Sequence, residues 1–260
     1  MMRVRTNNGR LTVTSSPLFV APKLNPQATC RIFCLPYAGG MAEIYCPWLN
    51  VLPEEFELVA VQYPGHVPGT GDELYTCLNS LAEEIANEIS AFSDKKYIIF
   101  GHSMGALIAY EVTRRLAGKK VRQPEHLFIA ARTPPHLPVV APMIHKMSDS
   151  EIIQIARAFN ALPEEVLQNE DILQMIIPTL KADFEMIGTW KHDHNAPPLN
   201  IPLCAFTGVF DSLGFPEQMK EWSNYTSNSF RMITMPEKHY FILNPAVQED
   251  IIRIIQDCIR

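Results

Sequence analysis

The sequence of 260 residues contains no C-x-x-C pair, no long apolar run, no internal repeat and no low-complexity tract. A membrane span needs about 18–20 successive apolar residues, so no membrane-embedded segment is predicted. The six cysteines have no partner at disulfide-motif or zinc spacing, which predicts reduced thiols. Basic residues are also scarce: 22 Lys and Arg against 28 Asp and Glu give a net charge of −6. An acidic balance argues against nucleic acid or anionic lipid as a partner.

The amino-terminal segment carries several basic side chains but only a short apolar stretch, which Pro22 interrupts. It lacks the apolar centre of a secretory signal, so we expect a cytoplasmic protein. Residues 1–16 are polar, and we expect them to form a flexible tail. The chain is 47% hydrophobic and 19% charged, and its length allows a full core. We therefore expect one globular domain over residues 17–260.

Short apolar segments alternate with amphipathic ones along most of the chain. The apolar segments predict strands over Cys30–Leu35, Glu57–Tyr63, Tyr97–Phe100 and His126–Ala130, and a helical spacing covers Cys77–Phe92. Fully apolar strands that alternate with helices indicate βαβ units. The fold class predicted is α/β, a mostly parallel sheet with helices on both faces.

This alternation stops between about residues 142 and 198, where the pattern is helical throughout. Ser148 and Glu151 form a capping box, and a second helix continues through Pro178. Strand patterns resume after residue 202, followed by a terminal helix. A helical block between two strands of a parallel sheet predicts an inserted lid. We expect its apolar stripe to gate a chamber, or simply to pack on the core; the stripe is Ile152, Ile155, Phe159, Ile172, Met175 and Ile176.

Gly101-His102-Ser103-Met104-Gly105 has the pattern G-x-S-x-G. The pattern is common by itself, but here it joins a predicted strand directly to a predicted helix, as nucleophilic serines of hydrolases require. Small residues two positions before and after the serine avoid collisions in such a tight turn. The free N–H groups at the helix start face a developing oxyanion. Ser103 is therefore the candidate nucleophile.

A serine hydroxyl needs a histidine base, which must come from a loop at the carboxyl end of a later strand. His239 follows the strand pattern FRMITM and a three-residue turn, as the base requires. His192 and His194 lie in a polar stretch before two prolines, which is more typical of a solvated loop. His239 is therefore the candidate base.

The base needs a carboxylate that orients it, and in this fold the chain order is Ser, then Asp or Glu, then His. Asp211 follows the strand pattern LCAFTG after two further residues, 28 residues before the base. Glu217 and Glu221 fall on the intervening helix. Asp183 lies in the lid, where lid packing or substrate contact is the better interpretation. Asp211 is the candidate acid.

An oxyanion hole needs two backbone N–H donors. One is expected from Met104, and the other from the loop Pro36–Gly40, with Ala38 as the first choice and Tyr37 as the alternative. Tyr37 and Gly39 are expected to contact the substrate, since the two glycines of this loop let the backbone approach it closely. A Gly-Gly turn without chemistry is the competing interpretation. No metal ligand set is predicted.

Several segments in a fixed order carry a family resemblance: CRIFCLPYAGG, VQYPGH, GHSMGALIAYEV, LPEEVLQNEDILQMIIPTLKADF and HYFI. From about Leu18 onward the sequence resembles the type II thioesterases that serve non-ribosomal peptide and polyketide synthases. The resemblance implies an α/β-hydrolase fold with a helical lid, and it carries over Ser103, Asp211 and His239. It implies hydrolysis of acyl or aminoacyl thioesters from the phosphopantetheine arm of carrier proteins, which clears stalled or misprimed chains.

Three positions depart from the family pattern. His66 stands where the family usually has Arg, and Glu237-Lys238 replaces a common Gly-Gly before the histidine. Ala131-Arg132-Thr133 replaces the usual Ser-Gly after its strand. None of them touches the three reacting side chains.

The chemistry expected needs no metal or redox cofactor, because the 4′-phosphopantetheine belongs to the partner, an acyl or peptidyl carrier protein domain. We expect a monomer. The alternatives are a medium-chain acyl-carrier or product-releasing thioesterase, a generic carboxylesterase, and a non-catalytic carrier-binding protein on the same fold. A basic cluster is either a solvated helix end or a carrier-docking surface. The cluster is Arg114, Arg115, Lys119, Lys120 and Arg122.

Overall fold

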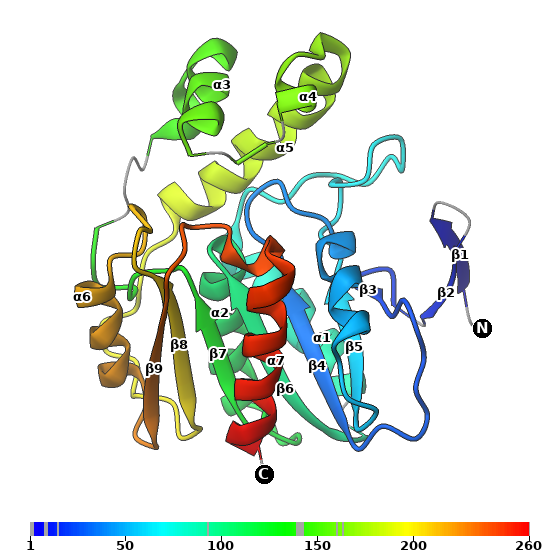
Figure 1. Ribbon diagram of the computed structural model, residues 1–260, viewed down its shortest axis with the longest axis vertical. Helices are drawn as coiled ribbons and strands as arrows, with labels where there is room; N and C mark the ends of the chain where they lie inside the picture. Colours follow the sequence, from blue (N-terminus) through cyan, green and yellow to red (C-terminus); the bar gives the residue numbers. More distant parts are fainter. Residues whose placement is uncertain are drawn as a thin grey trace.

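The computed structural model describes residues 3–7, 10–14, 16–92, 94–138, 143–159, 161–162 and 164–259. A seven-stranded sheet forms its centre, with the strand order β3-β5-β4-β6-β7-β8-β9 (Figure 1). β3 pairs antiparallel to β5, and the other pairs are parallel. The strands are β3 (Phe19–Val20), β4 (Cys30–Leu35), β5 (Phe56–Val61), β6 (Lys96–His102), β7 (Leu127–Ala130), β8 (Leu203–Gly208) and β9 (Phe230–Met235).

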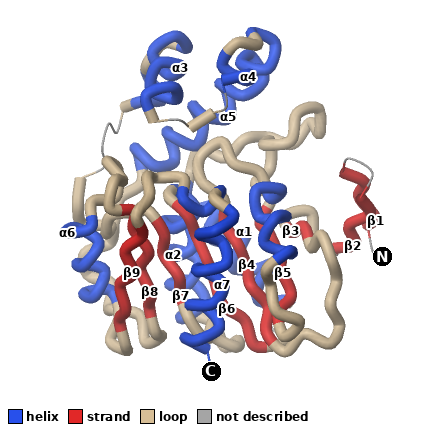
Figure 2. Tube along the Cα trace, in the orientation of Figure 1, coloured by secondary structure: helices blue, strands red, loops and turns tan. Residues whose placement is uncertain are grey.

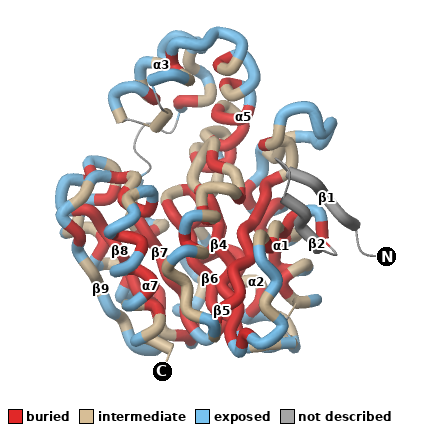
Figure 3. The backbone as a smooth tube through the Cα atoms, turned by 45° about the vertical axis from the view of Figure 1, so that its right-hand side comes forward, coloured by how far each residue is buried: buried red, intermediate tan, exposed pale blue. Residues whose placement is uncertain are grey.

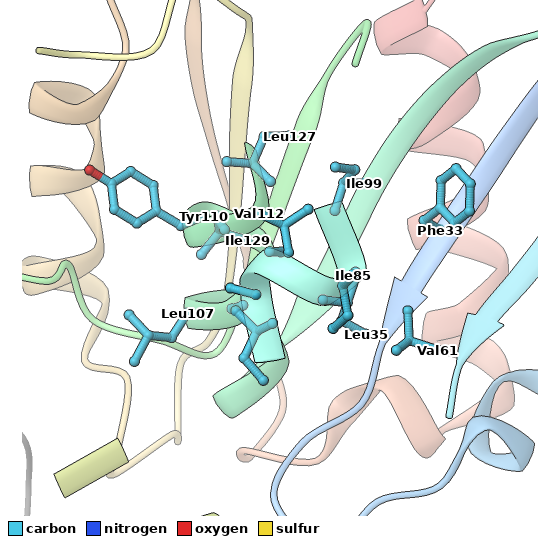
Figure 4. Close-up of a cluster of buried hydrophobic side chains, with 14 of the residues drawn as sticks. Phe33, Leu35, Val61, Ile85, Ile99, Leu107, Tyr110, Val112, Leu127 and Ile129 are labelled. Carbon is cyan, nitrogen blue, oxygen red and sulfur yellow. The ribbon is translucent and has the colours of Figure 1, made fainter. Parts of the chain in front are cut away.

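Helices cover both faces of the sheet. α1 (Leu78–Ala91) and α2 (Met104–Ala117) pack on one face, and η1 (Ala42–Asn50) and α7 (Pro245–Ile259) pack on the other. Because successive side chains of a strand point to opposite faces, each strand contributes to both cores. Phe33 of β4 lies in the core under α1 and α2 (Figure 4), whereas Ile32 lies in the core under α7. The predicted parallel α/β sheet with two covered faces is confirmed.

The segment between β7 and β8 is helical, as the sequence predicts. Its elements are η2 (Ile144–Lys146), α3 (Asp149–Ala158), α4 (Glu164–Leu167) and α5 (Glu170–Thr189). Both hydrogen bonds of the capping box at Ser148 are present, and α5 continues through Pro178. These helices lie beyond one end of the sheet, with loops between them and the strand ends (Figure 2). The expected lid start near residue 142 lies outside the described residues.

Much of α3 is exposed, whereas the strands below it are buried (Figure 3). The lid contains small apolar clusters of its own, which join α3, α4 and α5 to η2. The lid helices are therefore held mostly by contacts with one another, while the lower half of α5 reaches the main core through Met186 and Ile187.

Residues expected to form a flexible tail include a two-stranded antiparallel sheet, β1 (Arg3–Asn7) and β2 (Arg10–Thr14). Short elements not separated by the sequence pattern complete the fold: α6 (Pro216–Met219), η3 (Lys220–Tyr225) and η4 (Phe241–Leu243). In the part of the chain that is described, no helix is long and apolar enough to cross a membrane.

Candidate active site

Ser103 alone joins β6 to α2, because the strand ends at His102 and the helix begins at Met104. Its backbone has φ 55° and ψ −115°, a region that a residue with a side chain adopts only at a cost of about 1–3 kcal/mol. The Ser103 N–H donates to the carbonyl of Ala130 at the end of β7, 2.8 Å away. The turn is thus held by the neighbouring strand and presents the hydroxyl at the carboxyl edge of the sheet.

The two glycines of the motif allow this turn for a steric reason. A Cβ on Gly101 would lie 2.2 Å from the carbonyl oxygen of Gly105, and one on Gly105 would lie 2.1 Å from the carbonyl oxygen of Leu35. Both distances are far below a van der Waals contact, so a side chain at either position would force the backbone to move. The two glycines therefore allow α2 to pack closely against β6 and β4, and this packing positions the serine.

Ser103, His239 and Asp211 form one chain of hydrogen bonds. His239 Nε2 lies 3.0 Å from Ser103 Oγ, and His239 Nδ1 lies 2.9 Å and 3.0 Å from the two carboxylate oxygens of Asp211. The carboxylate also accepts the N–H groups of Leu213 and Gly214. With Nδ1 donating to the carboxylate, Nε2 is free to accept the serine proton. The structure therefore brings together the three side chains selected from the sequence.

The loops that carry the base and the acid are packed against each other. A Cβ on Gly208 would lie only 2.3 Å from the carbonyl oxygen of Glu237, so the two loops approach closely at this glycine. The Glu237 carboxylate accepts a hydrogen bond from Asn244 Nδ2 at 2.7 Å. Glu237, a departure from the family pattern, thus stabilises the turn that holds His239 near Asp211.

The other candidates for base and acid lie elsewhere. Glu221 is hydrogen-bonded to His136, and Glu217 to Lys220. His192 packs among aromatic rings rather than beside the serine. None of them contacts the chain of hydrogen bonds described above.

The expected oxyanion loop forms a tight turn after β4. Gly40 N–H donates to the carbonyl of Tyr37 at 2.8 Å, and Gly39 has φ +76°, as the third position of a type II turn requires. Met104 N–H lies at the start of α2, where no intrahelical acceptor exists. In the described part of the chain neither the Met104 nor the Ala38 amide has a backbone acceptor. Both amides are therefore available to a ligand.

Gly39 differs from the role expected of it. Tyr37 and Ala38 line the cavity beside Ser103, but Gly39 does not. Its N–H donates instead to Oδ2 of Asp183, 2.7 Å away. Burial raises the pKa of Tyr37 to about 12, so its phenol is protonated at neutral pH and can donate a hydrogen bond. Substrate contact in this loop is thus available to Tyr37 and Ala38.

His66 and Asp183 form a buried pair that the sequence did not reveal. His66 Nε2 lies 3.1 Å from Asp183 Oδ1, and His66 Nδ1 lies 3.0 Å from the carbonyl oxygen of Gly40. The carbonyl of Gly40 and an ionised Asp183 are both acceptors, so this geometry suits the doubly protonated imidazole, in which both ring nitrogens donate. Together with the Gly39 contact, this pair ties lid helix α5 to the loop that carries Ala38.

The pair predicts a pH-dependent component of stability. Burial lowers the pKa of His66, but the Asp183 carboxylate and hydrogen bonds to Asp183 and Gly40 raise it overall above its ordinary value. A raised folded pKa stabilises the fold below the unfolded value of about 6.5, and this stability is lost as the pH rises through the folded pKa. We expect the free energy of unfolding from urea titrations to lose about 1–3 kcal/mol from this pair above about pH 6.5.

His66→Arg is the matched control, since a guanidinium does not titrate in this range and the family usually has Arg here. Its unfolding free energy should fall less with rising pH than that of the wild type. Equal slopes for the two proteins would contradict the charged His66–Asp183 pair.

A cavity of about 1160 Å³, its opening included, lies beside Ser103 and His239. Most of its wall is apolar and comes from the lid. The lid residues are Ile144, Ile152, Ile155, Ala156, Phe159, Ala161, Leu180, Phe184, Ile187 and Gly188. Of the predicted lid stripe, the three members on α3 and at its end line this cavity, whereas Met175 of α5 is exposed. The reacting serine thus opens onto a space shaped for an apolar group.

The basic cluster at the end of α2 is largely engaged within the chain. Arg115 pairs with Glu111 and Glu83, Lys119 pairs with Glu83, and Arg114 pairs with Glu111. These ion pairs favour the solvated helix end over a free docking surface. Among the described residues, no group of three or more His, Cys, Asp or Glu side chains is placed to hold a metal ion.

The family model described as "Thioesterase domain" matches residues 30–259 and so spans the nucleophile turn, the lid and both later loops. The chain belongs to the thioesterase family. It is an enzyme that hydrolyses thioester bonds, and the motifs in its sequence, from the Gly-Gly loop to the histidine turn, are those of the type II thioesterases it resembles.

Several known thioesterases and biosynthesis proteins are similar to this chain over most of their length. The chain is 33% identical to gramicidin S biosynthesis protein GrsT of Aneurinibacillus migulanus, with 86% of this chain and 87% of GrsT covered. It is 30% identical to the thioesterase RedJ from the prodiginine pathway of Streptomyces coelicolor, at a TM-score of 0.82 with 89% and 86% covered. The type II thioesterase BorB from the borrelidin biosynthetic cluster is 28% identical, at a TM-score of 0.85 with 95% and 99% covered. The thioesterase thus has the α/β-hydrolase fold of these structures.

Proposed function

We propose that this thioesterase hydrolyses acyl or aminoacyl thioesters carried on the phosphopantetheine arm of a carrier protein, in non-ribosomal peptide or polyketide biosynthesis, with Ser103, His239 and Asp211 as its catalytic triad. The observation that carries the proposal is the hydrogen-bond chain from Ser103 to Asp211 at the wall of an apolar cavity. GrsT, RedJ and BorB, named for such pathways, support the partner and the pathway class.

Acylation begins when Ser103 Oγ attacks the thioester carbonyl and its proton passes to His239 Nε2. Asp211 accepts a hydrogen bond from Nδ1–H throughout and stabilises the imidazolium that forms. The N–H groups of Met104 and Ala38 stabilise the oxyanion of the tetrahedral intermediate. The C–S bond then breaks, and the leaving thiolate takes the proton from His239 Nε2.

Deacylation repeats these steps with water as the nucleophile. His239 Nε2 accepts a proton from water as its oxygen attacks the ester carbonyl of acylated Ser103. The tetrahedral intermediate collapses, the proton returns to Ser103 Oγ, and the free acid leaves. All proton transfers use this one imidazole, so the proposal includes no metal or redox cofactor.

Hydrolysis of an acyl-loaded carrier protein tests the function. With acetyl, aminoacyl and medium-chain acyl groups on the 4′-phosphopantetheine arm, we expect kcat/KM to exceed that for p-nitrophenyl esters of the same acids by at least about 10-fold. The release of free acid is followed by mass spectrometry. The control is the same acyl-loaded carrier protein incubated with the Ser103→Ala variant. A preference for the oxygen esters would support a generic carboxylesterase instead.

A further inference from the structure

Arg132 is a cation without a counter-ion in the wall of the cavity. It lines the same cavity as Ser103 and His239, and its Nε is buried without a hydrogen-bond partner. In the described part of the chain its guanidinium forms no ion pair and no hydrogen bond to a side chain. Every Asp and Glu of the sequence belongs to that part, and none of these side chains pairs with Arg132 there.

The backbone around Arg132 is rigidly held. Ala131 adopts a positive φ of 53°, and its N–H donates to the carbonyl of Phe206 at 2.9 Å. The carbonyl of Arg132 accepts the indole N–H of the fully buried Trp222 at 2.6 Å. This segment follows β7, the strand whose end also holds Ser103. The backbone of Arg132 is therefore held at the carboxyl edge of the sheet, where Ser103 also lies, and its side chain lines the same cavity.

An unpaired guanidinium in a mostly apolar wall is unfavourable unless a ligand supplies an anion. Burial lowers the pKa of Arg132 to about 10, which leaves it charged at neutral pH. No carboxylate side chain is among the residues that line the cavity. The planar fork of Arg matches a carboxylate with two parallel N–H···O bonds.

We propose that Arg132 binds a carboxylate at the far end of the acyl group, so that the thioesterase prefers dicarboxylic acyl thioesters such as malonyl or succinyl over neutral acyl groups of the same shape. This inference rests on the proposed function, because it places the acyl group in the cavity beside Ser103. The apolar wall then contacts the methylene carbons, while the guanidinium selects the charged end.

Matched thioesters of N-acetylcysteamine test the preference without the phosphate of the natural arm. Malonyl is compared with isovaleryl, and succinyl with 4-methylpentanoyl, since each pair differs only in carboxylate against isopropyl. We expect the wild type to favour the carboxylate in at least one pair. In Arg132→Met the charged-to-neutral ratio of kcat/KM should fall by about 30-fold or more, and Arg132→Lys should lie between.

Arg157→Met is the matched control, because Arg157 is an exposed arginine of α3 that pairs with Glu164 outside this cavity. Its charged-to-neutral ratio should equal that of the wild type. An unchanged ratio in Arg132→Met would overturn the proposal. So would an effect of Arg132→Met that appears only with phosphopantetheine thioesters, since the bound anion would then be the phosphate of the arm.

Binding separates this inference from the proposed function. Titration calorimetry of Ser103→Ala with malonate and succinate should detect binding of at least one, weakened about 10-fold or more by the added Arg132→Met change. If the dicarboxylates bind in an Arg132-dependent way but the wild type hydrolyses no thioester, the anion-binding role of Arg132 is supported and the proposed function is refuted. Thioester hydrolysis without Arg132-dependent binding would refute the cation site alone.

Discussion

Replacing Ser103 by Ala is expected to lower kcat for an acyl-loaded carrier protein by about 10³–10⁶-fold. The hydroxyl is the atom that His239 Nε2 contacts at 3.0 Å, and both residues line the cavity proposed to hold the acyl group. Single-turnover release of the acid, measured by mass spectrometry, gives the rate. The variant should fold normally, since only an oxygen is removed from a half-buried side chain.

The effects of the triad members should not add. Once Ser103 is absent, His239 has no hydroxyl proton to accept, so Ser103→Ala with His239→Ala should be about as slow as either single variant. A fluorophosphonate probe should label the wild type and leave Ser103→Ala unlabelled. A Ser103→Ala variant that keeps most of its activity would exclude the proposed nucleophile.

Gly105→Ala is expected to lower the free energy of unfolding by about 3–5 kcal/mol. Its Cβ would lie 2.1 Å from the carbonyl oxygen of Leu35 and 2.4 Å from that of Pro36. Both are backbone atoms of β4 and the loop after it, and they are held further by hydroxyls of Tyr45 and Tyr63. The clash can be relieved only by moving α2 away from the sheet, which separates buried apolar side chains.

Gly118→Ala is the matched control at the other end of α2. Its Cβ would meet the carbonyl of Arg115 at 3.6 Å, an ordinary contact, and its φ of −80° suits any residue. Urea denaturation followed by circular dichroism should place this variant within about 1 kcal/mol of the wild type. A Gly105→Ala protein equally close to the wild type would contradict the tight approach of α2 to β4.

The strand and helix pattern could be predicted because buried side chains recur with the period of a strand or a helix, and this period is visible in the sequence. β4, β8 and β9 span the predicted patterns, and β5, β6 and β7 differ from prediction by one or two residues at their ends. β3 has two residues, too few for any periodicity, and η1 is a 3-10 helix containing Pro47, which the pattern does not distinguish from a loop. These elements depend on contacts with the sheet that local sequence does not contain.

Ser103, Asp211 and His239 could be selected from the sequence because parallel strands place their carboxyl ends at one edge, so a residue just after such a strand has a known position. That rule applies to loops and not to the lid. Asp183 is one of many polar residues on a helix, and nothing in its neighbours shows that it accepts hydrogen bonds from Gly39 and His66.

Sequence alone therefore determined the sheet, the helical insertion and the three residues of the proposed triad, since these follow from periodicity and from the edge of a parallel sheet. Only the tertiary structure decided that Gly39 donates to Asp183, that His66 and Asp183 form a buried pair, and that Arg132 lines the cavity without an ion pair to a described carboxylate. Each of these depends on distances between segments far apart in the chain, and burial and pairing of a charge are properties of the folded arrangement, not of the residue.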